Sequence, residues 1–350
     1  MDQVLRLRLA DRGGRGSVRR GWGNGWVEGH DRVLFSCRRP WHHPCLPLPR
    51  EQNPLPPGKG GAQDGGVSSR LREIARENAE ILAAGGYRTR SGRQVPLAAA
   101  LADAKAGTRI YGPNQVIPGE QLVGGGRATV VEVTGESSTV AARRLAEGVP
   151  AGPGAGPAGA SVAVLNFASA RNPGGGYVRG AKAQEEALCR ASALYETLLE
   201  APEYYAVHRA EVSTFYTDRV IHSPGVPVFR DDRGDLMESP FLAGFLTSPA
   251  PNAGTILRQE PERAAEIPGA LVRRAELVLE VAASHGYRRL VLGAWGCGVF
   301  RNDPADVAEA FRGLLAGRFA GTFERVVFAV LDRKPDTREA FERALADLTA

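Results

Sequence analysis

The sequence predicts an α/β fold in which helices cover both faces of a mixed sheet. Three observations support this prediction. Short, almost wholly apolar runs are typical of buried strands, the amphipathic stretches between them are typical of helices, and the two kinds of segment alternate along most of the chain.

Composition divides the 350-residue chain near residue 66. Residues 1–66 are rich in Gly, Arg and Pro, lack sustained periodicity, and hold 11 Lys and Arg against 6 Asp and Glu. We expect a basic tail that is disordered or that precedes a true start at Val67, followed by a single domain over 67–350. The net charge of the whole chain is +5, so the tail accounts for it. The balanced charge of the domain gives no overall case for nucleic-acid binding.

Metal and membrane signals are weak. Cys37, His42, His43 and Cys45 lie close together in the tail, but zinc modules normally space their ligand pairs across a small fold, so we expect no metal site. No apolar run approaches the length of a membrane span. Four widely separated cysteines are not a disulfide framework, and a reducing cytoplasm is the expected compartment.

The domain begins with an amphipathic helix from Ser68 to about Ala84, and a second helix is expected over 96–106. A strand over 128–136 leads into a helix capped by serine. The run 161–168 is the signature of a buried strand, and a helix is expected over 185–200. The remaining strand-like runs are 213–223, 226–230, 241–250, 288–293 and 323–333. The remaining helices are expected over 267–286, over 304–317 and after Pro335.

Two glycine-rich loops, 174–176 and 293–298, each follow an apolar strand. In α/β sheets ligands bind at the carboxyl ends of the strands, so both loops are predicted to border one cleft. Consecutive glycines let backbone N–H groups approach a ligand, and a helix N-terminus favours negative charge. The second loop precedes a helix and could hold a diphosphate, although it lacks the dinucleotide-binding spacing G-x-G-x-x-G.

Glu185 and Glu186 open the helix that follows the first loop. Neighbouring helical residues point about 100° apart, so one carboxyl can face the cleft while the other meets a second partner. A carboxyl shielded from water has a raised pKa and can donate a proton, as cleavage of a glycosidic bond requires. The alternative is that both glutamates only stabilise the first turn of the helix through its dipole.

The segment "NPGGGYVRGAKAQEE" (172–186) combines three glycines with Gln-Glu-Glu seven residues later. With "VAVLNFASARNPGGG", "HSPGVPVFRDD", "SPAPNAG" and "VLGAWGCGVFRNDP", it resembles the poly(ADP-ribose) glycohydrolases of the compact bacterial type, over roughly residues 70–350. The resemblance implies a macrodomain-like three-layer α/β/α sandwich with N-terminal helices. It also implies hydrolysis of the ribose–ribose O-glycosidic bond, from chain ends, to release ADP-ribose as part of the response to DNA damage.

The resemblance also assigns roles to residues. Glu186 would be the catalytic acid and base, and Glu185 would hold ribose hydroxyls. The other residues would bind substrate: Asn172, Gly174, Gly175, Gly176 and Gln184 around the distal ribose and diphosphate; Gly296, Cys297, Gly298, Val299 and Phe300 from the other side; and Thr134 and Glu136 near the adenine.

This reading expects a monomer with no cofactor and no metal, whose partners are poly(ADP-ribose) or ADP-ribosylated proteins and the product ADP-ribose. Three other functions stay open: a macrodomain that binds ADP-ribose without cleaving it, a hydrolase of mono(ADP-ribosyl) groups, and a nucleotide-dependent oxidoreductase. The intact Gln-Glu-Glu argues against a reader, and the missing G-x-G-x-x-G argues against the oxidoreductase. A nucleic-acid-binding role is conceivable only for the tail.

Overall fold

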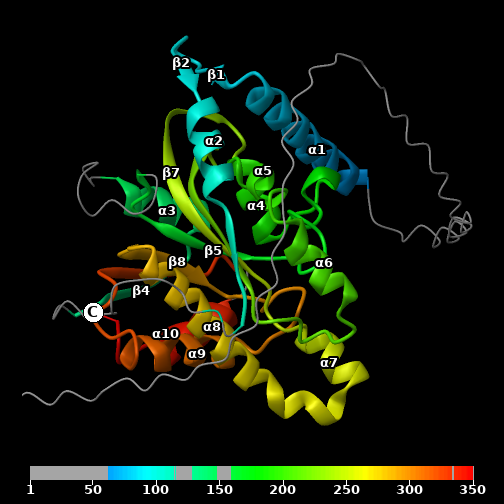
Figure 1. The fold of residues 1–350 in the computed structure, drawn as a ribbon, viewed down its shortest axis with the longest axis vertical. Coiled ribbons are helices and arrows are strands. Elements are labelled where there is room, and N and C mark those ends of the chain that lie inside the picture. The colour runs from blue at the N-terminus through cyan, green and yellow to red at the C-terminus, as the bar shows by residue number, and fades with distance from the viewer. Residues whose placement is uncertain (1–61, 114, 116–127, 148–158, 333–334, 350) are drawn as a thin grey trace, which may run out of the picture. The chain divides into compact units, whose positions relative to one another are not determined.

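The computed structural model describes residues 62–113, 115, 128–147, 159–332 and 335–349 (Figure 1). Residues 1–61 of the expected tail, the Cys37–Cys45 segment among them, lie outside the described residues, so the predictions for that segment stay predictions. The first helix, α1 (Ala62–Ala83), begins six residues before the predicted Ser68. The helix includes Gly65 and Gly66, so these glycines do not shift its first residue toward Ser68.

A seven-stranded mixed sheet forms the centre, in the order β3-β6-β7-β5-β8-β9-β4. From β7 to β4 neighbouring strands are parallel, whereas β3–β6 and β6–β7 are antiparallel. The predicted mixed α/β sheet is therefore confirmed. The strands are β3 (Arg109–Tyr111), β4 (Val130–Thr134), β5 (Ala163–Phe167), β6 (Val220–Arg230), β7 (Leu236–Ser248), β8 (Arg289–Gly293) and β9 (Arg325–Ala329). A separate antiparallel pair joins β1 (Gly86–Arg88) and β2 (Gln94–Pro96).

Helices cover both faces of the sheet, with a separate apolar core between each helical layer and the strands (Figure 1). One layer contains α7 (Ala253–Gln259), α8 (Ile267–Ser284), α9 (Pro304–Ala316) and α10 (Pro335–Ala344). The other contains α1, α2 (Ala98–Gly107), α3 (Ser138–Ala146), α4 (Gln184–Ala191), α5 (Leu194–Leu198) and α6 (Pro202–Ala210). Two short 3₁₀ helices are η2 (Tyr177–Arg179) and η3 (Pro261–Glu266).

The predicted helix over 185–200 is wrong in one respect, because it is two helices. The backbone is extended at Ser192, which forms an antiparallel bridge with Val228 of β6. The Ser192 hydroxyl donates to the carbonyl of Leu188 and accepts from the N–H of Leu194. Pairing with the sheet thus replaces the helical hydrogen bonds that the local sequence favours.

The strand prediction over 213–250 also needs correction. Residues 213–219 form turns, and the two runs 220–223 and 226–230 belong to one fully buried strand, β6. The register against β7 shifts between Ser223 and Val226, as a β-bulge does, so Pro224 and Gly225 fit without ending the strand.

None of the helices among the described residues is long and apolar enough to cross a membrane.

Candidate active site

The glycine loop follows β5 at the carboxyl end of the parallel strands. Gly174 and Gly175 have φ of +63° and +58°, a left-handed conformation that favours glycine. A Cβ at Gly174 would lie 2.8 Å from the Tyr195 ring, and one at Gly176 would lie 2.7 Å from Cβ of Ala181. The loop is therefore folded so tightly against α5 and its own return that side chains do not fit.

Gly175 brings the loop against both glutamates. A Cβ at this position would lie 2.5 Å from Oε1 of Glu186 and 3.0 Å from Oε2 of Glu185. The two carboxyl groups therefore converge on the same point of the backbone. The glycine allows the chain to close over them.

Glu185 is buried, with 3% of its surface exposed. Its Oε2 accepts a hydrogen bond from the Ser169 N–H at 2.7 Å, and its Oε1 accepts one from the Asn166 amide at 3.4 Å. Burial raises the pKa of Glu185 to about 8, and the charge of Glu186 adds to the rise, while the hydrogen bonds oppose it. Glu185 is therefore mostly protonated at neutral pH.

Glu186 is nearly as buried, at 7% exposure. Its Oε1 accepts a hydrogen bond from the N–H of Gly176 at 2.8 Å. Its Oε2 is buried and has no hydrogen-bond partner among the described residues. The side chain lines the cleft, so one oxygen is fixed by the glycine loop while the other can exchange a proton with a bound molecule.

Both polar atoms of the Gln184 side-chain amide form hydrogen bonds within the protein. Its Nε2 donates to the Ser138 hydroxyl at 3.1 Å and to the Leu165 carbonyl at 2.9 Å, and its Oε1 accepts from the Phe167 N–H at 2.9 Å. These bonds tie the start of α4 to the end of β5. They give Gln184 a positioning role in the site, and its contact with substrate stays a prediction.

The opposite wall of the cleft is the loop after β8. Gly296 has φ of +73°, and a Cβ there would lie 2.5 Å from both Ala250 Cβ and the amide nitrogen of Asn302. The Phe300 ring packs against the core and lies 5.9 Å from the ring of Tyr216. Val299 is 81% exposed. The loop thus exposes the side chain of Val299 and packs the side chain of Phe300 against the core.

Cys297 lines the cleft from this loop but is not a poised nucleophile. Burial raises the pKa of its thiol to about 12, and the nearby charges of Asp303 and Asp332 add to the rise. The reactive thiolate is therefore scarce at neutral pH. Its contacts to the core are those of a packing residue.

The loop after β8 and the paired glutamates line one cleft of about 1430 Å³. Of the predicted site residues, those that line it are Asn172, Gln184, Glu185, Glu186, Gly296, Cys297, Gly298, Val299 and Phe300. Gly174, Gly175 and Gly176 are not among the lining residues. Gly175 and Gly176 lie directly against the glutamates.

Thr134 and Glu136, the predicted adenine contacts, do not line the cleft. Thr134 ends β4, an edge strand, and its carbonyl accepts from the N–H of Val330. Glu136 forms an ion pair with Arg144 at 3.0 Å. The residues that follow, Ser137 to Thr139 at the start of α3, line the cleft instead, and the contact of Thr134 and Glu136 with adenine stays a prediction.

Sequence reasoning missed several residues in the cleft or directly behind it. Asn166 had a signal, because it is a polar residue inside the apolar run 161–168, and it donates to Glu185. Tyr216 had none, since nothing in its neighbourhood predicts its φ of +59°. The helix α1 and the turn over 231–235 also line the cleft, although both lie far from the glycine loop in the sequence.

Among the described residues, no three His, Cys, Asp or Glu side chains gather as metal ligands do.

Comparison with known proteins identifies the family. The model of the microbial-type PARG catalytic domain matches residues 75–231. The structure of poly(ADP-ribose) glycohydrolase from Thermomonospora curvata bound to the inhibitor ADP-HPD is 49% identical, with a TM-score of 0.70, and the match covers 79% of this chain and 99% of that one. The enzyme from Deinococcus radiodurans in complex with ADP-ribose is 48% identical, with a TM-score of 0.64 and coverage of 71% and 98%.

A comparison with curated protein sequences found no match. The similarity to the two solved enzymes nevertheless extends over almost their whole lengths, and the glycine loop and the paired glutamates lie within the residues that the family model matches. The chain therefore belongs to the microbial-type poly(ADP-ribose) glycohydrolase family.

Proposed function

We propose that this protein is a poly(ADP-ribose) glycohydrolase that cleaves ribose–ribose O-glycosidic bonds at chain ends and releases ADP-ribose. One observation carries the proposal: Glu186 has one oxygen fixed by the glycine loop and one without a protein partner, and it lies in a cleft large enough for a nucleotide. The relatives named above were solved with ADP-ribose or with the inhibitor ADP-HPD.

The reaction follows from this arrangement. The carboxylic acid of Glu186 donates its proton to the leaving ribose oxygen, and the bond between that oxygen and the anomeric carbon breaks. Water then attacks the anomeric carbon, and the Glu186 carboxylate takes the proton that the water loses. The products are ADP-ribose and a chain with a free hydroxyl.

Glu185 and the loops hold the substrate during these steps. Glu185, protonated at neutral pH because of its raised pKa, can donate to and accept from ribose hydroxyls. Asn172 and the glycine loop would hold the distal ribose and diphosphate, and the loop Gly296–Phe300 would enclose them. The substrate's own diphosphate would stabilise positive charge on the ribose, so we propose that no metal is required and that a chelator leaves the rate unchanged.

The described cysteines, Cys189 and Cys297, are free thiols, which supports the proposed cytoplasmic location. ADP-ribosylated proteins that carry the polymer are the proposed physiological partners.

The test compares the unchanged protein with Glu186→Gln on purified poly(ADP-ribose), with separation of the products. We expect free ADP-ribose from the unchanged protein and a rate that is roughly 10²- to 10⁴-fold lower for Glu186→Gln, the usual contribution of a general acid and base. ADP-ribose affinity should stay within a few fold. Glu203→Gln, an exposed glutamate of α6, is the matched control.

Three outcomes would contradict the proposal or one part of it. Binding of ADP-ribose without release from either protein would leave a reader module. Release at an undiminished rate from Glu186→Gln would remove the residue from its assigned role. Oligomers as the first products, instead of single ADP-ribose units, would overturn attack at chain ends.

A further inference from the structure

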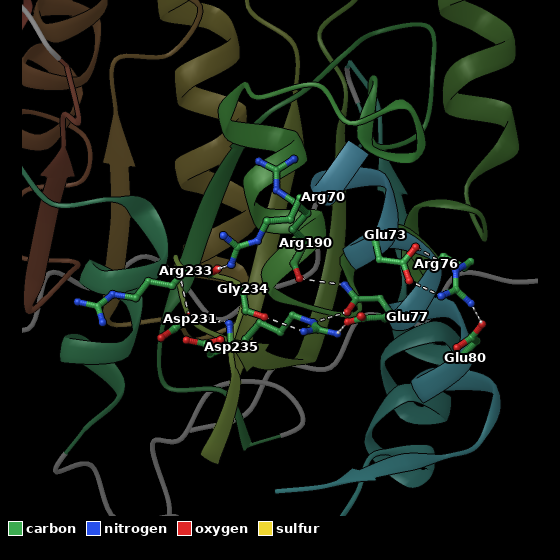
Figure 2. Close-up of polar contacts among 12 residues, drawn as sticks. Arg70, Glu73, Arg76, Glu77, Glu80, Arg190, Asp231, Arg233, Gly234 and Asp235 are labelled. Carbon is green, nitrogen blue, oxygen red and sulfur yellow. Dashed lines mark hydrogen bonds and ion pairs between the residues drawn. The ribbon is translucent and has the colours of Figure 1, made fainter. Parts of the chain in front are cut away.

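The cleft continues past Glu186, away from the loop after β8, into a space between α1 and the turn that joins β6 to β7. Val67, Arg70 and Ile74 line it from α1, and residues 231–235 line it from the turn. The two elements are joined directly, since Arg70 donates to the carbonyl of Arg233 at 2.8 Å (Figure 2). This part of the cleft has no role in the function proposed above.

Three arginines line this extension: Arg70 on α1, Arg190 on α4 and Arg233 on the turn (Figure 2). Arg190 lies one helical turn after Glu186; burial lowers the pKa of its guanidinium, and the charge of Glu186 opposes that shift. Its guanidinium donates to the Ala181 carbonyl at 2.6 Å.

None of the three guanidinium groups forms an ion pair with a carboxylate of the described residues. Other arginines nearby do: Arg76 pairs with Glu73 and Glu80, and Arg230 pairs with Glu77 at 2.9 Å (Figure 2). The arginines that line the cleft therefore keep donors for an external anion, and planar guanidinium groups suit the oxygens of a phosphate.

The same turn carries acidic groups. Asp231, Asp232 and Asp235 also line the cleft. Oδ1 of Asp231 accepts the N–H groups of Arg233 and Asp235, both at 2.9 Å, and so holds the turn in shape. These carboxylates confine the positive potential to the guanidinium groups, and carboxylate oxygens can accept hydrogen bonds from the ribose hydroxyls beside a diphosphate.

The orientation of the substrate in the proposed reaction indicates which part of it would occupy this extension of the cleft. Glu186 protonates the oxygen of the leaving chain, so that chain begins at Glu186. The bound ADP-ribose unit fills the side between the glycine loop and the loop after β8, so the leaving chain extends the other way. We propose that Arg70, Arg190 and Arg233 form a subsite for the diphosphate of the first ADP-ribose unit of the leaving chain; this inference rests on the proposed function.

The test uses two substrates that differ only in the leaving group. One is poly(ADP-ribose), and the other is an ADP-ribose whose distal ribose carries a simple aryl group in place of the chain. The double variant Arg70→Gln/Arg233→Gln is expected to lower kcat/KM about tenfold on the polymer, since two charge-assisted hydrogen-bond donors are lost, and less than twofold on the aryl glycoside.

The matched control is Arg72→Gln/Arg88→Gln, which removes the same charge from two exposed arginines that are not among the cleft-lining residues. It should leave both rates unchanged. Arg70→Lys/Arg233→Lys keeps the charge and should retain most of the polymer rate, which guards against an effect of misfolding.

Each outcome of this test supports or overturns the proposed subsite. An equal loss on both substrates, or no loss on either, would overturn the leaving-chain subsite while the proposed function stands. If the unchanged protein releases ADP-ribose from neither substrate, the proposed function fails, and the subsite fails with it.

Discussion

At the scale of single residues, the three glycines and the two glutamates form one structural unit. The backbone at Gly175 approaches both carboxyl groups so closely that a methyl group would overlap Glu186, and the N–H of Gly176 fixes one of the two Glu186 oxygens. The glycines therefore have a structural role beside the substrate contacts proposed for them. They set the geometry of the acid that is proposed to act on it.

Substitution of Gly175 by alanine should impair both stability and activity. The φ of +58° strains any residue with a side chain, and the added Cβ would force Glu186 to move. We expect a loss of roughly 1 to 3 kcal/mol in the free energy of unfolding, with a large fall in the rate of ADP-ribose release. Denaturant unfolding and product assays measure the two effects.

Gly298→Ala is the control for stability, because it has no positive φ and a Cβ there meets no atom within 4 Å. Its unfolding midpoint should match that of the unchanged protein. Equal midpoints for Gly175→Ala and Gly298→Ala would show that the close approach at Gly175 is not strained.

At the scale of elements, a buried amide of α1 joins this helix to three other elements. Asn78, 1% exposed, donates to the Tyr177 hydroxyl at 3.1 Å and to the Arg190 carbonyl at 2.9 Å, and it accepts from Arg230 at 2.7 Å. These bonds join α1 to η2, α4 and β6. The wall of the cleft formed by α1 therefore depends on a residue that does not line it.

Replacement of Asn78 by alanine should loosen α1. It leaves the buried Arg230 guanidinium and the Arg190 carbonyl short of partners, so we expect a loss of about 2 to 4 kcal/mol in the free energy of unfolding. Amide hydrogen exchange should rise in α1 more than in α8, which packs on the other face of the sheet.

The exposed substitution Glu80→Gln on the same helix should change neither the unfolding free energy by more than about 0.5 kcal/mol nor the exchange in α1. If Asn78→Ala raised exchange uniformly over the protein, α1 would not be a locally held element.

At the scale of the whole molecule, the mixed sheet gathers distant loops at one edge, because the parallel strands β5, β8 and β9 all end there. The same packing buries the carboxyl of Glu185, so its ionisation costs free energy in the folded state. A carboxyl held away from water opposes folding whenever it must be ionised, so the cost appears in the pH dependence of global stability.

The sign follows from the pKa. Glu185 has a folded-state pKa of about 8, above its ordinary value of 4.5. Between these values the folded protein holds a proton that the unfolded chain has released. The bound proton therefore adds to the free energy of unfolding. This contribution is fully present below about pH 4.5 and is lost as the pH rises through 8, at about 1.4 kcal/mol for each pKa unit.

The measurement is denaturant unfolding from pH 5 to pH 8.5 for the unchanged protein and for Glu185→Gln, which keeps an acceptor for the Ser169 N–H but cannot ionise. We expect the unchanged protein to lose stability relative to the variant across this range. Parallel stability curves would mean that Glu185 titrates with an ordinary pKa in the folded state.

The sequence by itself determined the class of fold and the two loops of the site. Alternation of apolar runs and amphipathic stretches predicted the mixed sheet with helices on both faces, and β5 was recognised because a strand buried on both faces has no polar alternation. The glycines and the Glu185–Glu186 pair were also visible in the sequence, since their local spacing places a loop and a helix start within a few residues of each other.

Only the tertiary structure decided what lies opposite these residues. The break at Ser192, the displacement of the cleft wall from Glu136 to Ser137–Thr139, and the approach of α1 to the turn over 231–235 all depend on pairing between segments far apart in the chain. Local patterns record the preference of a segment, whereas burial, pKa shifts and the convergence of Arg70, Arg190 and Arg233 arise from contacts that form only when the sheet and its layers pack together.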